Sequence, residues 1–458
     1  MHFGLEWAIG YLLYAGMLVA LCLTVFWKPI VGIYYLAPLI PMQTIRYRLN
    51  EFPLGGSMIG LVLLAVFIGL RRHKEPMLLK TPWNRMLWFY IGFTYVSLVL
   101  GAFYLDSDLP FFPGEKRLGY WQEYVTMIAL FFAVAAAVKN ARQMKVILLL
   151  MCVSVFLLDR NFWETVRDRD FSTFSNDLRD EGGMGYAGVN GLAAFEAQFA
   201  IFLLCMSGCL RGVRAKIGCL ALAGYSVLCL MYSLSRGGYA AFLAGWVVLG
   251  MMRQRILLVL LLAFLLVWTA VVPNAVKMRV DMTYNEDTGD IDHSAQLRVE
   301  MWDDAMTLFA SSPVLGTGFY TYAFMHRVLE YQDTHNFFVK VLLETGIIGM
   351  LVFLWLLLRF FWLGFRFSRQ AQDPFFAALG LGLAGWVVTS AVANFFGDRW
   401  TFLQVNGYMW VIAGLVARSM ALESQSPQQA QTEAKQDTRE ENGKVASPLV
   451  AWFGEAFA

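Results

Sequence analysis

The sequence predicts an all-α polytopic membrane protein with 12 or 13 transmembrane helices and a large loop outside the membrane that contains short helices. Apolar runs of about 20 residues recur along the chain, and each is long enough to cross ~30 Å of hydrocarbon. The 458 residues are 58% hydrophobic and only 15% charged, which excludes a soluble globular protein and a nucleic-acid-binding protein. Lys and Arg gather in short linkers between alternate runs, as they do on the cytoplasmic side of membrane proteins.

The first apolar run lacks a basic start and a small-residue cleavage site, so we expect a retained helix rather than a signal peptide. The second run is short and is either re-entrant or tilted. The expected spans lie near residues 8–26, 28–41, 54–70, 84–102, 121–138, 144–158, 190–209, 214–232, 237–251, 254–272, 336–363, 375–394 and 401–418. The six cysteines all fall inside these runs, which favours packing over disulfides or metal binding.

The basic linkers orient the helices by the positive-inside rule. They comprise residues 71–74, 139–145, 211–216, 253–255 and 366–369. The opposite side then holds the longer segments 42–53, 103–120, 159–189 and 273–335. In a Gram-negative cell that side is the periplasm, so we expect a multi-pass protein of the inner (cytoplasmic) membrane. With 13 spans and a cytoplasmic C-terminus the N-terminus lies outside, and with 12 it lies inside.

Two domains are expected. Residues 1–420 form the transmembrane domain, which includes the periplasmic loop 273–335, and residues 421–458 form a cytoplasmic tail. From Glu423 to Lys444 the tail is rich in Gln, Glu and Lys and has no apolar period, so we expect it to be disordered.

The segment from Arg298 to Gly349 is charged and aromatic where it leaves the membrane, and it holds most of the residues expected to carry chemistry. Residues 294–309 have a helical apolar spacing at Leu297, Met301, Ala305 and Leu308. Arg298 and Trp302 are four apart and share one face of that helix. An Arg fork suits phosphate oxygens and an indole suits a sugar ring, although the pair taken alone favours an interfacial anchor.

Glycine-rich stretches occur in two of the outer segments. Pro313 is expected to end the helix after Arg298, and Gly316 and Gly318 then allow a tight turn. Residues 182–191 contain five glycines ahead of another span. This second stretch is either the edge of a cleft lined by backbone or a flexible loop.

His335 is the expected proton acceptor. Asp333 or Thr334 is the expected N-cap of the following span, which would place His335 in its first helical turn. The positive end of a helix disfavours an imidazolium, so we expect a neutral ring. A capping or interfacial histidine is the alternative.

Several arginines lie at the outer ends of spans. Arg236 stands between two spans, and an Arg there is costly unless it is paired, snorkels or binds an anion. Asp398 and Arg399 lie in a short outer turn, and Arg46 and Arg48 also lie outside, against the positive-inside trend. Each arginine is expected to meet an anionic lipid or to form a local ion pair.

The order of these motifs resembles the O-antigen ligase and polymerase family of bacterial membrane glycosyltransferases, which includes exopolysaccharide polymerases and O-glycosylation ligases. The resemblance covers roughly residues 182–417. The motifs are Ser-x-Ser-Arg-Gly at 233–237, Arg298-x-x-x-Trp302, Pro313-x-x-Gly316-x-Gly318-x-Tyr320, His335-Asn336 and Leu343-Glu344-x-Gly346-x-x-Gly349.

The resemblance implies transfer of a glycan from a polyprenyl-pyrophosphate donor to an acceptor hydroxyl on a glycan, lipid or protein, at the periplasmic side. Arg298 and Arg236 would neutralise the pyrophosphate and His335 would orient or deprotonate the acceptor. The substrate-binding residues expected beside them are Trp302, Tyr320, Asn336, Asp398 and Arg399. No cluster of outer Asp residues has the spacing of a divalent-metal site, so we expect a metal-independent, inverting enzyme without a cofactor.

Two alternatives stay open. The residues do not separate a ligase from a polymerase, which differ only in the acceptor. A transporter or flippase of lipid-linked glycans would show ionisable residues at mid-membrane and repeated halves, whereas this chain collects its charge in outer loops.

Overall fold

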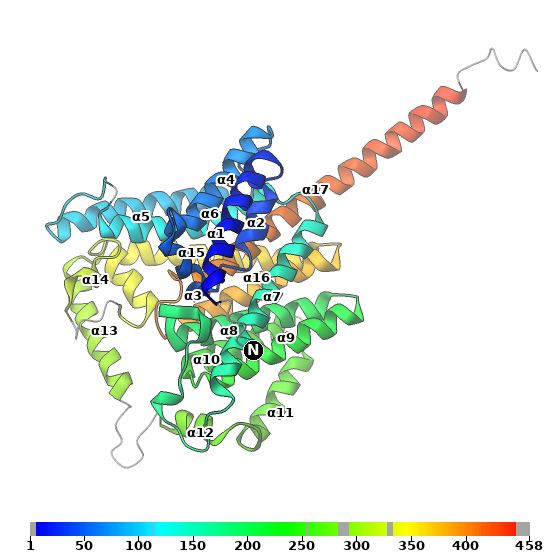
Figure 1. The fold of residues 1–458 in the computed structure, drawn as a ribbon. Coiled ribbons are helices and arrows are strands. Elements are labelled where there is room, and N and C mark those ends of the chain that lie inside the picture. Colours follow the sequence, from blue (N-terminus) through cyan, green and yellow to red (C-terminus); the bar gives the residue numbers. More distant parts are fainter. Residues whose placement is uncertain (1–5, 113, 253–254, 283–292, 328–332, 446–458) are drawn as a thin grey trace, which may run out of the picture.

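The computed structural model describes residues 6–112, 114–252, 255–282, 293–327 and 333–445, and every regular element in these ranges is a helix (Figure 1). Ten helices are long and apolar enough to cross a membrane. They are α1 (Glu6–Phe26), α4 (Met58–Arg72), α5 (Asn84–Tyr104), α6 (Lys116–Ala137), α7 (Ala141–Val166), α8 (Gly188–Cys209), α9 (Val213–Tyr232), α15 (Phe337–Gln370), α16 (Pro374–Asn394) and α17 (Leu403–Val445). The chain is therefore an all-α polytopic membrane protein.

The remaining helices are shorter or bent. They are α2 (Ile30–Leu36), α3 (Gln43–Tyr47), α10 (Arg236–Met252), α11 (Ile256–Val271), α12 (Asn274–Asp281), α13 (His293–Ser311), α14 (Tyr322–Met325) and the 3₁₀ turns η1 (Arg48–Glu51), η2 (Gly55–Ser57), η3 (Asn176–Leu178) and η4 (Gly182–Ala187).

The described residues give ten helices that could span a membrane, against the 12 or 13 spans expected. α2 has only 7 residues, as expected of a short or re-entrant segment. α10 has 17 residues, which rise about 26 Å and fall short of a ~30 Å hydrocarbon layer. α11 and α12 together would make an eleventh span, but they meet at an angle of 108°.

α8 and α16 form the centre of the bundle. α8 packs against α9, α10 and α16, and α16 packs against α15 as well. Phe195, Phe199 and Phe202 of α8 surround Trp386 of α16, which is fully buried. Gly364 and Gly380 let α15 and α16 approach until a Cβ on either would meet the other's carbonyl oxygen, at 2.9 and 2.7 Å. Small residues permit such close contacts between membrane helices.

α17 runs past the expected end of the last span and reaches Val445 (Figure 1). It therefore continues through much of the segment that the composition predicts to be disordered. Glu, Gln, Ala and Lys dominate this segment, and all four favour a helix, so high polarity does not prevent helix formation there.

α15 is broken at Gly346, and the turn after α13 fills the break. Gly346 has a positive φ of 66°, and a Cβ there would lie 2.2 Å from the carbonyl oxygen of Val314. The N–H groups of Thr317 and Gly318 donate to the carbonyls of Leu343 and Glu344, at 3.0 and 2.7 Å. In return, the N–H of Ile347 donates to the Pro313 carbonyl at 2.9 Å. The turn thus satisfies backbone groups that the broken helix leaves open.

The carboxylate of Glu344 ties the same turn to α15 a second time. It accepts the backbone N–H of Tyr320 at 2.8 Å and that of Tyr322 at 3.3 Å. On the other side of the turn, Gly318 lies against α5, where Phe319 donates its N–H to the Ser97 carbonyl at 3.1 Å. The loop that leads to His335 is therefore anchored to two membrane helices.

Candidate active site

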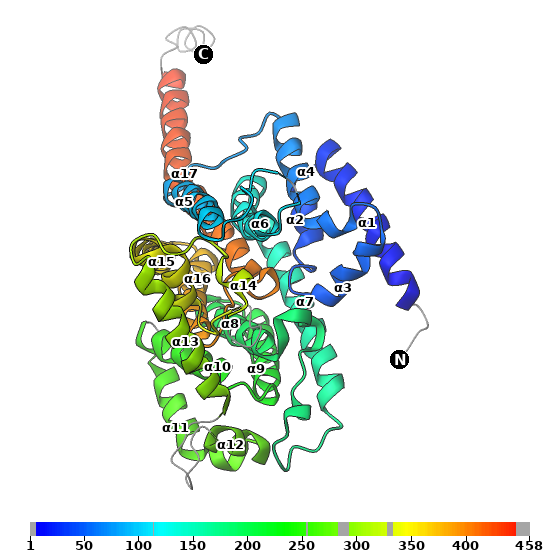
Figure 2. The ribbon, with the colours of Figure 1, turned by 90° about the vertical axis from the view of Figure 1, so that its left-hand side faces the viewer.

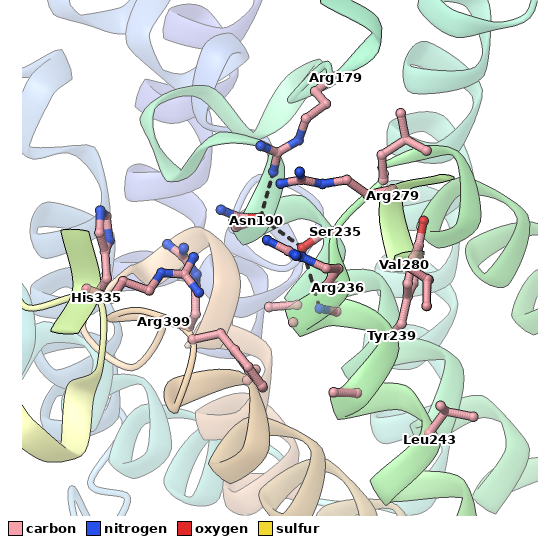
Figure 3. A pocket seen from close by; sticks show the side chains of 18 of the residues that line it. Arg179, Asn190, Ser235, Arg236, Tyr239, Leu243, Arg279, Val280, His335 and Arg399 are labelled. Carbon is pink, nitrogen blue, oxygen red and sulfur yellow. Dashed lines mark hydrogen bonds between the residues drawn. The ribbon is translucent and has the colours of Figure 1, made fainter. Parts of the chain in front are cut away.

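A cavity of about 650 Å³ opens between α8, α10, α12, α13 and the loops before α15 and α17 (Figure 3). Its charged lining consists of Arg179, Arg236, Arg279, Arg298, Arg399 and His335. The lining residues of the described part include no Asp or Glu. Five guanidinium groups from five segments thus face one space, which is the composition of a site for a multiply charged anion.

Arg236 is the first residue of α10, at the boundary between two helices as expected. The hydroxyl of Ser235 donates to Asn190 Oδ1 at 2.8 Å and accepts the N–H of Gly238 at 3.4 Å (Figure 3). Arg179 donates from Nη2 to the same Asn190 oxygen at 2.9 Å. Asn190 therefore links the arginine of the 167–181 loop to the start of α10.

Gly237 and Gly238 allow close packing at the start of α10. A Cβ on Gly237 would lie 2.7 Å from Phe396 Cβ, and one on Gly238 would lie 2.6 Å from Ala193 Cβ. The two glycines let the first turn of α10 sit against α8 and the loop after α16. This close packing brings Arg236 and Arg399 to the same cavity.

α13 confirms the helix expected over residues 294–309, and Pro313 follows its end. Met301, Ala305 and Leu308 are buried, and the last two pack on Leu343 of α15. Arg298 lines the cavity. Trp302 does not, because its indole N–H donates to the carbonyl of Thr334 at 2.9 Å and so holds the loop that carries His335.

His335 lies before α15, not in its first turn. The N-cap is Asn336, whose side chain accepts the N–H groups of Phe338 and Val339, so the prediction of Asp333 or Thr334 as the cap is wrong. The positive φ of 49° at His335 is incompatible with a right-handed helix. The Asn336 side chain accepts hydrogen bonds from two N–H groups that have no partner inside the helix, so the helix begins at Phe337.

Asp333 holds the imidazole. One of its oxygens accepts the backbone N–H of His335 and lies 3.0 Å from the ring Nδ1. Burial alone would raise the pKa of Asp333, but the hydrogen bond from His335 and the charges of Lys340 and Arg399 outweigh it and hold the pKa well below its usual range. Asp333 is thus a carboxylate that orients His335, whose side chain is 35% exposed.

Behind His335 lies a buried ion pair between Lys340 of α15 and Asp398. Their charged atoms are 3.0 Å apart, and both side chains are only 4% exposed. Asp398 also accepts the N–H and hydroxyl of Thr401, and Lys340 lies 4.4 Å over the ring of Tyr320. Removing one member of a buried ion pair leaves the other charge unpaired and lowers the stability far more than the intact pair raises it. The pair therefore holds the loop that contains Asp398 firmly against α15.

The expected site residues thus divide into two groups. Arg236, Arg298, His335 and Arg399 line the cavity. Trp302, Tyr320, Asn336 and Asp398 do not line it and instead support the loops that do. Tyr320 also stacks on Tyr120 of α6, with ring centroids 4.3 Å apart.

Three charged residues were not singled out from the sequence. Arg179 and Arg279 join the cavity, and their positions in the outer segments 159–189 and 273–335 are the only sequence signal for them. Lys340 is a cation in the first turn of a long apolar helix, and a charge inside a span is a sign of a site or of a buried partner.

The electrostatics of the cavity favour an anion strongly. Burial lowers the pKa of Arg179, and the charges of Arg236 and Arg298 act in the same direction. Arg179 Nε is buried without a hydrogen-bond partner in the described part of the chain. Burial also lowers the pKa of Arg399, while Asp333 and Asp398 oppose that change. A bound phosphate or diphosphate would relieve this repulsion and accept the buried donors.

Residues 221–354 match the profile of a family described as O-antigen ligase, and no curated protein matches the chain. The matched residues include Arg236, Arg298 and His335, whereas Arg179, Asp398 and Arg399 lie outside them. The part of the chain that carries the first three is therefore similar to the O-antigen ligase family.

Proposed function

We propose that the chain transfers a glycan from a polyprenyl-pyrophosphate donor to an acceptor hydroxyl, as a polysaccharide ligase or polymerase. The observation that carries this proposal is the cavity in which five arginines and His335 meet. The family match supports the reaction class. The donor, the acceptor and the periplasmic side of the inner membrane are parts of the proposal.

The donor's pyrophosphate would lie among the arginines. Arg236 and Arg298 would grip its oxygens, and Arg179, Arg279 and Arg399 would complete the positive lining. The anomeric carbon would then face His335. An acceptor oxygen attacks that carbon, the bond from carbon to the phosphate oxygen breaks, and polyprenyl pyrophosphate leaves with the electron pair. Arginines placed where this charge develops would stabilise the transition state.

His335 would take the acceptor's proton as the new glycosidic bond forms. Asp333, 3.0 Å from Nδ1, would stabilise the imidazolium that results. A single displacement of this kind inverts the anomeric centre. No group of three or more His, Cys, Asp or Glu residues in the described ranges is placed to hold a metal, and the proposal uses none.

The test is transfer from a purified polyprenyl-pyrophosphate glycan by the protein in lipid vesicles, with and without EDTA. Arg236→Lys and Arg298→Lys should each lose about 10²–10³ of the rate, because Lys keeps the charge but loses the fork that binds two phosphate oxygens. Chelation should leave the wild-type rate unchanged.

Arg327→Lys is the matched control. Arg327 belongs to the same loop, but its guanidinium pairs with Asp304 at 2.9 Å and its side chain is 42% exposed. Exposed pairs contribute little, so this variant should transfer at the wild-type rate. Equal loss in Arg327→Lys and Arg298→Lys would contradict the pyrophosphate assignment. A requirement for an ion gradient, with no new glycosidic bond, would instead favour a transporter or flippase.

A further inference from the structure

A second group of polar and aromatic side chains lies beside the cavity. It joins α3, α6, η4 and the start of α17, and we call it the tyrosine platform: Arg46, Tyr47, Glu123, Tyr186 and Phe402. Tyr47 and Tyr186 are stacked with ring centroids 6.2 Å apart, and Tyr186 meets Phe402 edge-on at 5.4 Å. Tyr47 is 48% exposed and Tyr186 is 57% exposed. The two tyrosine rings are thus exposed, and the aromatic rings beside them hold them in place.

The glycine-rich stretch at 182–191 is what positions Tyr186. Gly185 has a φ of 62°, and a Cβ there would lie 2.7 Å from Gln43 Oε1. The hydroxyl of Thr44 donates to the Gly183 carbonyl at 3.2 Å. η4 therefore lies directly on α3, which only glycine permits at this distance. The stretch is a fixed edge, not a flexible loop.

Two buried glutamine side chains form a hydrogen-bonded network behind the tyrosine rings. Gln404 donates to Gln43 at 2.9 Å, and Gln43 donates to the hydroxyl of Tyr47 at 2.6 Å. Gln43 and Gln404 are 2% and 1% exposed. Such a satisfied network fixes the direction of the tyrosine hydroxyls.

Arg46 contributes a donor that the fold leaves open. Its Nε is buried and has no hydrogen-bond partner among the described residues. Its nearest charged and phenolic neighbours are Tyr186, Tyr47 and Glu123. A buried donor without a partner in a folded protein needs a water or a ligand.

The platform and the cavity are neighbours. Tyr186 comes just before Asn190, and Phe402 comes just after Arg399, and both Asn190 and Arg399 line the cavity. η4, which carries Tyr186, packs against α3, α8 and α17, and α8 lies between α3 and α13 in the view of Figure 2. A chain that lies on the platform would therefore lie beside the segments that line the cavity.

The chemistry of the platform differs from that of the cavity. It carries one cation and one carboxylate, so it has no excess charge to select a phosphate or an anionic lipid. It offers stacked aromatic faces flanked by amide, guanidinium and carboxylate groups. A neutral, hydroxyl-rich chain with apolar ring faces matches this set, because the faces pack on tyrosine and the hydroxyls find donors and acceptors.

We propose that the tyrosine platform binds the acceptor glycan and delivers its terminal hydroxyl to His335. The delivery of the hydroxyl to His335 rests on the proposed function, whereas binding of the glycan to the platform does not. The surface is therefore an acceptor subsite, separate from the arginines that would hold the donor.

The first test separates the two substrates in the transfer assay. Tyr186→Ala and Tyr47→Ala should raise the apparent KM for the acceptor by about 10-fold, the size expected on removing an anchoring aromatic side chain, and should leave the donor KM within about twofold. Tyr186→Phe keeps the ring and should restore most of the acceptor affinity. Phe112→Ala, at another aromatic residue that is 77% exposed, is the matched control and should change neither value. An unchanged acceptor KM, or an equal rise in both values, would overturn the proposal.

The second test needs no turnover. Short fragments of the host cell's own surface polysaccharide, freed of lipid pyrophosphate, are mixed with the full chain in lipid nanodiscs and observed by saturation-transfer NMR. Wild type and Arg236→Lys should both give a signal, and Tyr186→Ala should lose most of it. Absence of signal with wild type would overturn the platform. Failure of wild type to transfer sugar while this signal persists would count against the proposed reaction instead.

Discussion

At the scale of single residues, the site depends on one histidine held in an uncommon backbone conformation. His335 has a φ of 49°, which costs a residue other than glycine about 1–3 kcal/mol. Asp333 accepts from both its backbone and its ring, and Trp302 binds the carbonyl of the residue between them. Strain of this kind persists where surrounding contacts determine the geometry, and here those contacts aim one ring into the arginine-lined cavity.

Asp333→Asn should destabilise the protein at pH 7 and do so less at low pH. The folded pKa of Asp333 lies below its unfolded value near 4, so the ionised carboxylate stabilises the fold above that value. This contribution is lost as the pH falls through the lower folded pKa. Unfolding temperatures of wild type and variant should therefore differ at pH 7 and begin to converge as the pH falls below about 4.

Asp168→Asn is the matched control for this prediction. Asp168 also lies outside the spans, but its side chain is 83% exposed and pairs with its neighbour Arg167, at 3.3 Å. It should shift the unfolding temperature little at either pH. A constant difference between wild type and Asp333→Asn at all pH values would show that the loss is steric rather than electrostatic.

At the scale of elements, two sequence motifs form one joint. The break in α15 at Gly346 and the turn at residues 313–318 exchange backbone hydrogen bonds, and each is incomplete without the other. Of the glycines in this joint, Gly318 has the least space for a side chain. A Cβ there would lie 2.1 Å from Gly101 Cα, and its φ is 109°. Arg117 of α6 closes the joint by donating to the carbonyls of Leu98 and Phe319. A helix break that is filled by another segment is rigid, which suits a loop that must place His335.

Gly318→Ala should lower the unfolding free energy by about 1–3 kcal/mol or more, because the turn and α5 must separate and the residue must leave a glycine conformation. Transfer activity should fall with it. Thermal unfolding in detergent and the vesicle assay measure both effects.

Gly92→Ala provides the comparison within α5 itself. Nothing lies within 4 Å of a Cβ at Gly92, and alanine favours a helix by up to about 1 kcal/mol over glycine, so this variant should be neutral or slightly more stable. If both variants unfold at the wild-type temperature, the joint is looser than its geometry implies.

At the scale of the whole molecule, α8 and the loop before α17 join the cavity to the tyrosine platform, and the long end of α17 extends away from α13 and α14 (Figures 1 and 2). We propose, from the distribution of Lys and Arg, that the cavity and the platform face the periplasm. Every residue assigned to the two sites depends on that orientation.

Cysteine labelling tests the orientation. In a variant whose 6 native cysteines are replaced, Ser107→Cys and Asp168→Cys should react with a membrane-impermeant maleimide added to intact spheroplasts. Arg142→Cys and Arg369→Cys should react only after the membrane is opened. All four positions are exposed in the structure, so a lack of labelling reports sidedness rather than burial. The reverse pattern would place the cavity in the cytoplasm and would exclude a periplasmic reaction.

The sequence alone determined the class of the protein and the separate pieces of the site. Runs of apolar residues specify membrane helices because an uncharged backbone segment in hydrocarbon must satisfy its own hydrogen bonds, and this constraint is local. The helix that carries Arg298, its end before Pro313 and the boundary position of Arg236 follow from residues close in sequence. The family motifs lie in the same stretches.

Only the tertiary structure decided which of these residues meet. Arg179, Arg279 and Arg399 reach the cavity because α8, α12 and the loop before α17 pack around it, and no local pattern encodes such contacts. Trp302, Tyr320 and Asp398 carry the residue types of a substrate site, yet their partners lie inside the protein. Asn336, rather than Asp333 or Thr334, is the N-cap of α15, because His335 has a backbone conformation that no right-handed helix can include. Hydrogen bonds from His335 to Asp333 and from Trp302 to Thr334 stabilise that conformation, and Trp302 belongs to another helix. Charge and shape are local properties of a residue, but the group that each one meets is set by packing across the whole bundle.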